Sequence, residues 1–249
     1  MSFLWEEKVL IIIPTYNERL TIRSLVVELF NLYPKVSICV VDDSSPDGTG
    51  EEAKKLATEF NDKFFTISRP KKSGRGNAVV EGLKFGLKQS KFEYFVEMDS
   101  DFSHDPKDLQ RIMHESNDYD IVVGSRYLSE SRIVNWPLGR KCFSLCANFL
   151  VRQMLKLPLS DCTNGYRCYS YEAVRTLDFE GIHGSGFIVL SSIAYQQFLK
   201  GLSFFEVPTL FVNRTRGHSN FSIGEVTHSI LTLWKIKKTN RDTIELEKI

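Results

Sequence analysis

Two aspartates, Asp99 and Asp101, follow a predicted strand and are separated by one residue. Carboxylates at this spacing can both reach a hard cation such as Mg²⁺ or Mn²⁺, which usually also engages substrate phosphates. The pattern is common, and the alternative is an acidic turn that caps a helix beginning near Pro106. Asp42 and Asp43 end another predicted strand, and like charges gathered at one sheet edge repel each other. A cation or the donor groups of a nucleotide would offset this repulsion, so the sequence favours a metal site.

Basic side chains in the second half of the chain are candidates for phosphate binding, because a guanidinium group holds phosphate through paired hydrogen bonds. Taken singly, each of them is more often a solvated surface residue. Only a shared location on one face would make them a phosphate site. The candidates are Arg126, Arg140, Lys141, Arg167, Arg214 and Arg216.

Two glycines, Gly74 and Gly76, flank Arg75 at the start of a predicted helix. The segment lacks both the GxxxxGK[ST] and the GxGxxG pattern of phosphate-binding loops. A tight turn that allows close helix packing explains these glycines at least as well as a direct phosphate contact.

Apolar residues form a broad stripe on a long predicted helix over residues 138–157. The stripe consists of Leu145, Phe149, Val151, Met154, Leu155 and Leu157. Such a stripe is usually core, and the alternative is a surface that receives an isoprenoid chain or rests on a bilayer. The last predicted helix, over 223–237, offers the same two alternatives, because a mostly apolar run over 230–234 precedes several lysines.

Composition and missing motifs exclude several other classes of protein. A net charge of +1 over 249 residues gives no argument for nucleic acid as a partner. The five cysteines form no CxxC pair, which favours reduced thiols in the cytosol. The sequence has neither HExxH nor GxSxG, so zinc hydrolases and serine hydrolases are disfavoured. No signal peptide and no apolar stretch of about 20 residues is present, so we expect no membrane crossing.

Short buried strands alternate with helices in the first half of the chain. The predicted strands cover residues 8–13, 36–41, 64–68 and 94–98, with helices over 17–33, from 49 onward and over 74–89. In the second half, residues 119–125 and 203–212 have strand character. This order predicts an α/β fold with a mostly parallel central sheet flanked by helices, whose ligand lies beyond the carboxyl ends of the strands. Without repeats or linkers, we expect one domain over 1–238 and a loose polar tail over 239–249.

Several segments together resemble one family, the dolichol-phosphate or polyprenyl-phosphate mannose synthases, which are inverting nucleotide-sugar transferases of the family 2 type. The similar segments run in order from about residue 9 to residue 235. They are Pro14-Thr15-Tyr16-Asn17-Glu18-Arg19, residues 40–49 with Ser45-Pro46-Asp47-Gly48-Thr49, Met98-Asp99-Ser100-Asp101-Phe102-Ser103-His104, Gly124-Ser125-Arg126-Tyr127, Asn135-Trp136-Pro137, Ala147-Asn148, and Val207-Pro208 with Arg214.

The resemblance implies a GT-A fold, which is Rossmann-like, and a role for each matching residue. It implies nucleotide contacts from Pro14, Tyr16, Glu18, Val41 and Asp43. Asp99, Ser100 and Asp101 would hold the donor and a Mg²⁺ or Mn²⁺ ion, with Asp101 the chief ligand and Ser103 near the metal. Arg126, Arg140 and Ser144 match positions that handle acceptor or donor phosphate, and Arg214 matches a diphosphate contact.

Two segments depart from the family pattern. Residues 188–190 are Ile188-Val189-Leu190 where the family usually has Gln-x-Glu, and Asn220 stands where the family has lysine. These departures leave alternatives open. One is the same fold with UDP-glucose as donor or with another acceptor. The other is an inactive scaffold subunit that binds nucleotide-sugar, although the intact Asp99–Asp101 segment and Arg126 argue against it.

The reaction that the resemblance implies is transfer of mannose from GDP-mannose to dolichyl or polyprenyl phosphate. A phosphate monoester is largely dianionic at neutral pH, so it can attack the anomeric carbon in line without a general base. Attack from the opposite face inverts the configuration, while the metal and the arginines stabilise the departing nucleoside diphosphate. The family resemblance further implies that the protein binds peripherally to the cytoplasmic face of a membrane, either the endoplasmic reticulum or a bacterial plasma membrane. It also implies small membrane-protein subunits as possible partners.

Overall fold

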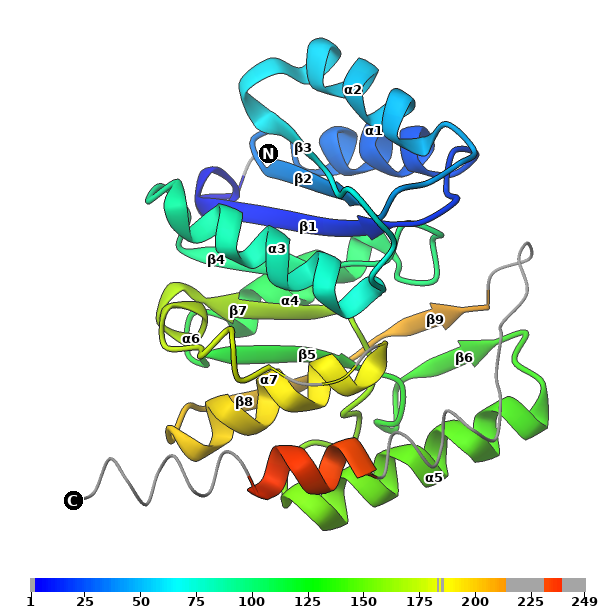
Figure 1. Cartoon of the computed structure of the whole chain (residues 1–249), viewed down its shortest axis with the longest axis vertical. Coiled ribbons are helices and arrows are strands. Elements are labelled where there is room, and N and C mark those ends of the chain that lie inside the picture. The colour runs from blue at the N-terminus through cyan, green and yellow to red at the C-terminus, as the bar shows by residue number, and fades with distance from the viewer. Residues whose placement is uncertain (1–2, 183, 185, 214–230, 239–249) are drawn as a thin grey trace.

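The computed structural model describes residues 3–182, 184, 186–213 and 231–238. A seven-stranded sheet has the order β3-β2-β1-β4-β7-β5-β8, and β6 and β9 form a small second sheet (Figure 1). The strands are β1 (Val9–Thr15), β2 (Ser37–Asp42), β3 (Phe64–Ser68), β4 (Tyr94–Glu97), β5 (Ile121–Ser125), β6 (Arg132–Val134), β7 (Arg167–Ser170), β8 (Phe204–Pro208) and β9 (Leu210–Val212). Only β7 of the large sheet runs antiparallel to its neighbours, so the predicted mostly parallel sheet is confirmed.

Helices cover both faces of the sheet. They are α1 (Ile22–Leu32), α2 (Thr49–Phe60), α3 (Arg75–Lys88), α4 (Leu109–Glu115), α5 (Leu138–Leu155), α6 (Tyr171–Arg175) and α7 (Phe187–Leu199), and residues 231–238 are helical. The sequence of strand β1 is continuously apolar because both faces of the strand are buried. Leu10 and Ile12 pack toward α3 and α7, whereas Ile11 and Ile13 pack toward α1 and α2, and all four are fully buried.

The first helix begins later than the sequence predicts. Expected from residue 17, it begins at Ile22, and residues 17–21 form a loop in which Asn17 has a φ of 61°. The predicted strand over 203–212 is also two strands, which are separated by Thr209. Strand β8 pairs with β5 and β9 pairs with β6, which carries the chain from one sheet to the other.

The sequence pattern missed β6, β7, α6 and α7, and the last strand and helix of this set have a clear physical reason. Strand β7 carries a charged residue, Arg167, in a four-residue run, which hides its position inside the sheet. Helix α7 has no polar face, because it is buried between the sheet and its neighbouring helices. Of the predicted last helix, residues 231–237 are helical, while 223–230 and the tail over 239–249 lie outside the described residues. No helix in the described part of the chain has the length and apolarity needed to cross a bilayer.

Gly74 and Gly76 have separate structural roles at the start of α3. Gly74 has a φ of 91°, in the left-handed region that favours glycine. A Cβ at Gly76 would overlap the side chain of Val189, so Gly76 permits α3 and α7 to pack closely. The packing interpretation of this glycine is therefore confirmed.

Candidate active site

A pocket of about 670 Å³ opens at the carboxyl ends of β1, β2 and β4. The general rule for parallel sheets predicts a ligand site at this edge. The predicted site residues that line it are Pro14, Tyr16, Glu18, Asp43, Asp99, Ser100, Asp101, Ser103 and Arg140. Thus the structure brings together residues from three strand ends and from α5, which lies far along the chain.

The loop after β4 is held in shape by its own hydrogen bonds. The main-chain N–H of Ser103 donates to Asp101 Oδ1 at 3.0 Å, and the N–H of Asp99 donates to His104 Nδ1 at 3.1 Å. Because Nδ1 accepts, the proton of a neutral His104 lies on Nε2, which donates to Asn164 Oδ1 at 2.9 Å. His104 also stacks on Tyr166, with 4.9 Å between ring centroids. This buried histidine therefore orients the loop that carries both aspartates.

The oxygen atoms of this loop fit a hard divalent cation. Asp99 and Asp101 line the same pocket, with the Ser100 and Ser103 side chains beside them. Within residues 3–213 and 231–238, apart from the undescribed positions, no three His, Cys, Asp or Glu side chains group as a metal site. The described protein side chains therefore offer two carboxylates, and substrate phosphate and water would complete the coordination of such an ion.

Arg75 lies at the same place, which the sequence pattern did not predict. Its Nε donates to Asp99 Oδ1 at 2.7 Å, and its Nη1 forms a short ion pair with Glu97. Burial alone would lower the pKa of Arg75, but Asp99 and Glu97 raise it. The Tyr169 hydroxyl donates to the second oxygen of Glu97 at 3.2 Å. Three charged groups and a tyrosine thus form one network at the base of the pocket.

Asp43 holds the loop that precedes α3. Its carboxylate accepts hydrogen bonds from Arg69 Nη1 at 2.6 Å, from the Ser73 N–H at 3.0 Å and from the Gly74 N–H at 2.7 Å. Asp42, in contrast, faces the turn after β2, where the Ser45 N–H donates to it at 3.1 Å. The two adjacent acids therefore have different surroundings, and only Asp43 lines the pocket.

The aromatic wall of the pocket near β1 contains Tyr16. Lys72 Nζ lies 3.6 Å from the centroid of the Tyr16 ring, a cation–π contact between two residues that line the pocket. Glu18 is placed by its main-chain N–H, which donates to Thr49 Oγ1 at 2.9 Å, and its side chain accepts from Thr21 Oγ1 at 3.0 Å. Residues 17–21 thus form a pocket wall rather than the first turn of a helix.

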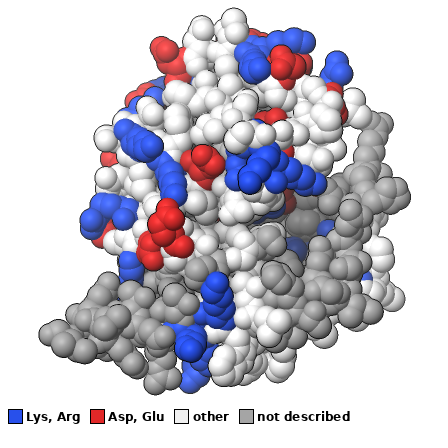
Figure 2. All heavy atoms as spheres, in the orientation of Figure 1, with Lys and Arg blue, Asp and Glu red and all other residues white. Residues whose placement is uncertain are grey.

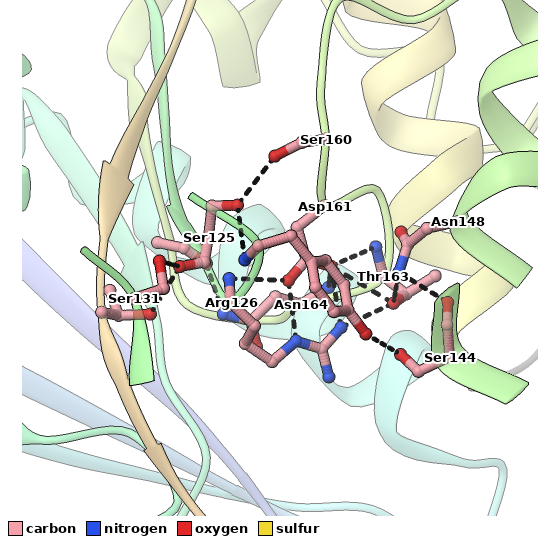
Figure 3. Close-up of polar contacts among 12 residues, drawn as sticks. Ser125, Arg126, Ser131, Ser144, Asn148, Ser160, Asp161, Thr163 and Asn164 are labelled. Atoms are coloured by element: carbon pink, nitrogen blue, oxygen red, sulfur yellow. Dashed lines mark hydrogen bonds and ion pairs between the residues drawn. The ribbon is translucent and has the colours of Figure 1, made fainter. Parts of the chain in front are cut away.

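Arg126 is held by Asp161, a residue that the sequence pattern did not single out. Nε and Nη2 of Arg126 each donate to an Asp161 oxygen at 2.7 Å, and Nη2 also donates to Thr163 Oγ1 (Figure 3). Burial would raise the pKa of Asp161, but the charge and hydrogen bonds of Arg126 lower it. The third guanidinium nitrogen, Nη1, points away from these partners and makes none of the hydrogen bonds found among the described residues (Figure 3).

Trp136 brings Arg126 and Arg140 to one region. The guanidinium carbons of Arg126 and Arg140 lie 5.2 Å and 4.7 Å from the centroid of the Trp136 ring. Arg140 also donates to Asn213 Oδ1 at 2.6 Å. Ser144, one turn further along α5, accepts from the Tyr127 hydroxyl at 2.6 Å and does not line the pocket. Two of the predicted phosphate-binding arginines therefore share one location.

Other predicted site residues lie elsewhere or outside the described chain. The prediction for Arg167 is wrong, because its buried guanidinium donates to the main-chain oxygens of Cys162, Asn164 and Leu190 at 2.7–3.1 Å. Val41 is fully buried in the core and does not line the pocket, so its nucleotide contact stays a prediction. Arg214, Arg216 and Asn220 lie outside the described residues.

The sequence contained a signal for some of the missed residues. Arg75 stood between two glycines that were noted, but no sequence pattern connects it with Asp99. Asp161 is a single polar residue whose partner is 35 positions away, and the contact of His104 with Asn164 spans 60 positions along the chain. Only the folded topology makes these contacts visible.

Comparison with known proteins agrees with the family resemblance of the sequence. The model of the family described as Glycosyl transferase family 2 matches residues 10–178. An undecaprenyl-phosphate mannosyltransferase of Micrococcus luteus is 36% identical over 91% of this chain and 92% of its own length. A polyprenol monophosphomannose synthase of Mycolicibacterium smegmatis is 34% identical over 93% of this chain and 88% of its own length.

Solved structures show the same architecture. A glucosyl-3-phosphoglycerate synthase from Mycobacterium tuberculosis, in complex with Mn²⁺, UDP and phosphoglyceric acid, matches with a TM-score of 0.65. The match covers 94% of this chain and 78% of that one at 18% identity, so it bears on the fold alone. The predicted GT-A fold is confirmed. With the family match over most of its length and close relatives named as sugar transferases, this chain is a glycosyltransferase that belongs to glycosyl transferase family 2.

Proposed function

We propose that this enzyme transfers mannose from GDP-mannose to a polyprenyl phosphate, with inversion at the anomeric carbon and with help from Mg²⁺ or Mn²⁺. The names of the two relatives, at 34–36% identity over most of the chain, support mannose as the sugar and polyprenyl phosphate as the acceptor. The observation that carries the proposal is the joint position of Asp99, Asp101 and Arg140 on one pocket of about 670 Å³. Acidic groups for a cation and a basic group for phosphate meet there.

Asp99 and Asp101 would hold the metal ion, with Ser103 beside them. The solved structures of the glucosyl-3-phosphoglycerate synthase in complex with Mn²⁺ and a uridine nucleotide support a divalent metal in this fold. When bound, the ion would supply positive charge that stabilises the departing diphosphate. The Ser103–Asp101 hydrogen bond and the His104–Asp99 hydrogen bond keep the carboxylates in position for this task.

The arginines near Trp136 would bind the acceptor phosphate. Arg140 lines the pocket, and Nη1 of Arg126 points away from its Asp161 partner (Figure 3). A phosphate monoester has its second pKa near ~6, so the acceptor attacks as a dianion and needs no general base at neutral pH. The contribution of the protein is then to align the phosphate with the anomeric carbon and to exclude water.

A lipid-linked acceptor has to reach this pocket from a membrane, and α5 with the helix over 231–238 forms a suitable surface. The two helices lie side by side and share one core cluster (Figure 1). Their exposed large apolar side chains are Leu138, Leu145, Phe149, Leu150, Leu231 and Trp234. We define these six residues as the apolar surface.

Positive charge accompanies the apolar surface. Helix α5 contains Arg140, Lys141 and Arg152, residues 231–238 contain three lysines, and neither segment contains an acidic residue. At the lower edge of the face in Figure 2, where helix 231–238 runs, Lys and Arg side chains gather below the acidic groups. Apolar residues among cations are typical of a helix that lies on an anionic bilayer. We therefore propose peripheral binding of this surface to the cytoplasmic face of a membrane, with or without small membrane-protein subunits.

Transfer of a radiolabelled sugar to polyprenyl phosphate in detergent tests the proposed function, with the label on the sugar of each donor. GDP-mannose is compared with UDP-glucose as donor, each with Mn²⁺, with Mg²⁺ and with EDTA. Metal-dependent label in the lipid fraction from GDP-mannose alone supports the proposal. Label from UDP-glucose alone would show that UDP-glucose is the donor. The absence of label from either donor would favour another acceptor or a nucleotide-sugar-binding scaffold.

A further inference from the structure

The guanidinium group of Arg75 occupies the place beside Asp99 where a metal ion would bind. Arg75 Nε and Nη2 lie 2.7 Å and 2.5 Å from the same atom, Asp99 Oδ1. Arg75 is the first residue of α3 and lines the pocket together with Asp99 and Asp101. A cation on Asp99 Oδ1 and the Arg75 guanidinium would therefore compete for one oxygen.

The two carboxylates that Arg75 contacts differ in their surroundings. The Glu97 side chain is fully buried, and Tyr169 donates to its second oxygen at 3.2 Å. The Asp99 side chain is 30% exposed and faces the pocket. Loss of the Glu97 contact would leave a buried charge uncompensated, whereas loss of the Asp99 contact would not. Arg75 is thus anchored on Glu97 and can release Asp99.

Gly165 makes this position of Arg75 possible. A Cβ at Gly165 would overlap the Arg75 guanidinium, because the main chain of residue 165 packs directly on it. The loop after Asp161 therefore packs against one side of the Arg75 guanidinium. This close approach supplies a way to displace Arg75 without removing its charge.

The charge balance of the pocket depends on Arg75. Glu97, Asp99 and Asp101 are three acids within five residues, and like charges at such short range disfavour one another. The Arg75 guanidinium compensates part of this negative charge while no ligand is bound. A nucleoside diphosphate brings negative charge of its own, which an anchored guanidinium can bind through its remaining N–H groups.

We infer that Arg75 is a resident counter-ion that positions Asp99 and opposes binding of the metal alone, so that metal and nucleoside diphosphate bind together. When both arrive, Asp99 turns to the metal and Arg75, still paired with Glu97, donates to the diphosphate. Arg75 is in this account a positioning residue that couples the two ligands. The inference rests on the proposed function only in taking a divalent metal as a ligand of Asp99.

Mn²⁺ binding, measured from the electron paramagnetic resonance signal of free Mn²⁺, tests this coupling with and without GDP. The variant for comparison is Arg75→Met combined with Glu97→Gln, which removes the cation and its buried partner together, so the net charge is preserved. Lys84→Met combined with Glu180→Gln removes an exposed ion pair of α3 and is the control for loss of one charge pair. Thermal unfolding establishes that each variant is folded.

We expect the double variant to bind Mn²⁺ alone about 10-fold more tightly than the wild type, which corresponds to ~1.4 kcal/mol. The increase in Mn²⁺ affinity that GDP causes should shrink by about the same factor. Gly165→Ala, which displaces Arg75 but keeps its charge, should change Mn²⁺ binding in the same direction. The control that combines Lys84→Met with Glu180→Gln should behave like the wild type.

An unchanged or weaker Mn²⁺ affinity in the folded double variant would overturn the inference, as would an undiminished effect of GDP. The absence of Mn²⁺ binding in every protein, with and without GDP, would overturn it together with the metal site. The readout is independent of mannose transfer. The proposed sugar and acceptor can therefore fail in the transfer assay while the Mn²⁺ result stands, and the reverse also holds.

Discussion

Two arginine–aspartate pairs in this enzyme have the same Nε–carboxylate distance but opposite surroundings. Arg75 Nε and Arg126 Nε each lie 2.7 Å from their aspartate. The side chains of Arg75 and Asp99 are 29% and 30% exposed, whereas those of Arg126 and Asp161 are 7% and 0% exposed. We call them the open pair and the closed pair. The comparison shows that an ion pair at one distance can be an exchangeable contact or a fixed part of the fold.

Main-chain hydrogen bonds explain much of the difference. Asp161 accepts from the main-chain N–H groups of Arg126 at 3.1 Å and Asn164 at 3.1 Å, in addition to the guanidinium. Its carboxylate is satisfied from several directions, so the closed pair cannot exchange partners without unfolding of the loop. Asp99 instead faces the pocket, where a ligand can replace Arg75.

The largest expected effect is on activity and comes from the loop of the open pair. Asp101→Ala should lower mannosyl transfer by about 10³-fold or more, because a preorganised charge at the reacting diphosphate is lost. Because the half-buried Asp101 lines the pocket and is not part of the core, the melting temperature should stay near that of the wild type. Transfer of radiolabel and thermal unfolding are measured together, and substantial retained activity would remove Asp101 from the metal site.

The closed pair should affect stability instead. Asp161→Asn leaves the Arg126 guanidinium buried without a compensating charge, which should lower the free energy of unfolding by about 3–5 kcal/mol. Urea denaturation measures this loss, with Asp178→Asn as an exposed control that keeps the same chemical change. A loss of unfolding free energy below about 1 kcal/mol would show that Asp161 does not stabilise the buried Arg126 as the geometry indicates.

The effect of Asp161→Asn should also depend on pH in a defined direction. The pKa of Asp161 is lower in the folded state than its ordinary value of 3.8, since Arg126 outweighs the effect of burial. The stabilisation by the charged form is therefore complete well above pH 4 and is lost as the pH falls through the folded pKa. The difference in unfolding free energy between wild type and variant should stay constant from pH 8 to about pH 5 and shrink below about pH 4. A difference that grows in acid would contradict this assignment.

The smallest expected effect comes from a region outside both pairs. Phe149→Ser with Trp234→Ser removes two large side chains of the apolar surface and should weaken binding to anionic phosphatidylglycerol vesicles by at least about 10-fold. GDP binding in solution should be unchanged, because neither residue lines the pocket. Leu4→Ser, at an exposed apolar residue near the N-terminus that does not line the pocket, is the control in vesicle sedimentation. Equal binding by all three proteins would remove the apolar surface from the account.

The contrast between the pairs also shows how far the sequence alone leads. The apolar run of β1 and the acids after β4 predicted both the parallel sheet and the position of the pocket, because strand ends carry local signals. Arg126 was identified as a candidate, but its partner Asp161 was not, since an ion pair between residues 35 positions apart leaves no local pattern. Strand β7 was missed for a related reason. Its buried Arg167 is satisfied by main-chain oxygens that only the fold supplies.

The most direct test of the open and closed pairs follows the ¹⁵N-labelled Nε–H groups of Arg75 and Arg126 by NMR during a titration with GDP and Mg²⁺. The variants Arg75→Lys and Arg126→Lys assign the two signals. We predict that the Arg75 signal shifts as Asp99 is released, while the Arg126 signal stays in place. Binding of GDP and Mg²⁺ that leaves Arg75 unshifted, or that moves both signals equally, would contradict the account.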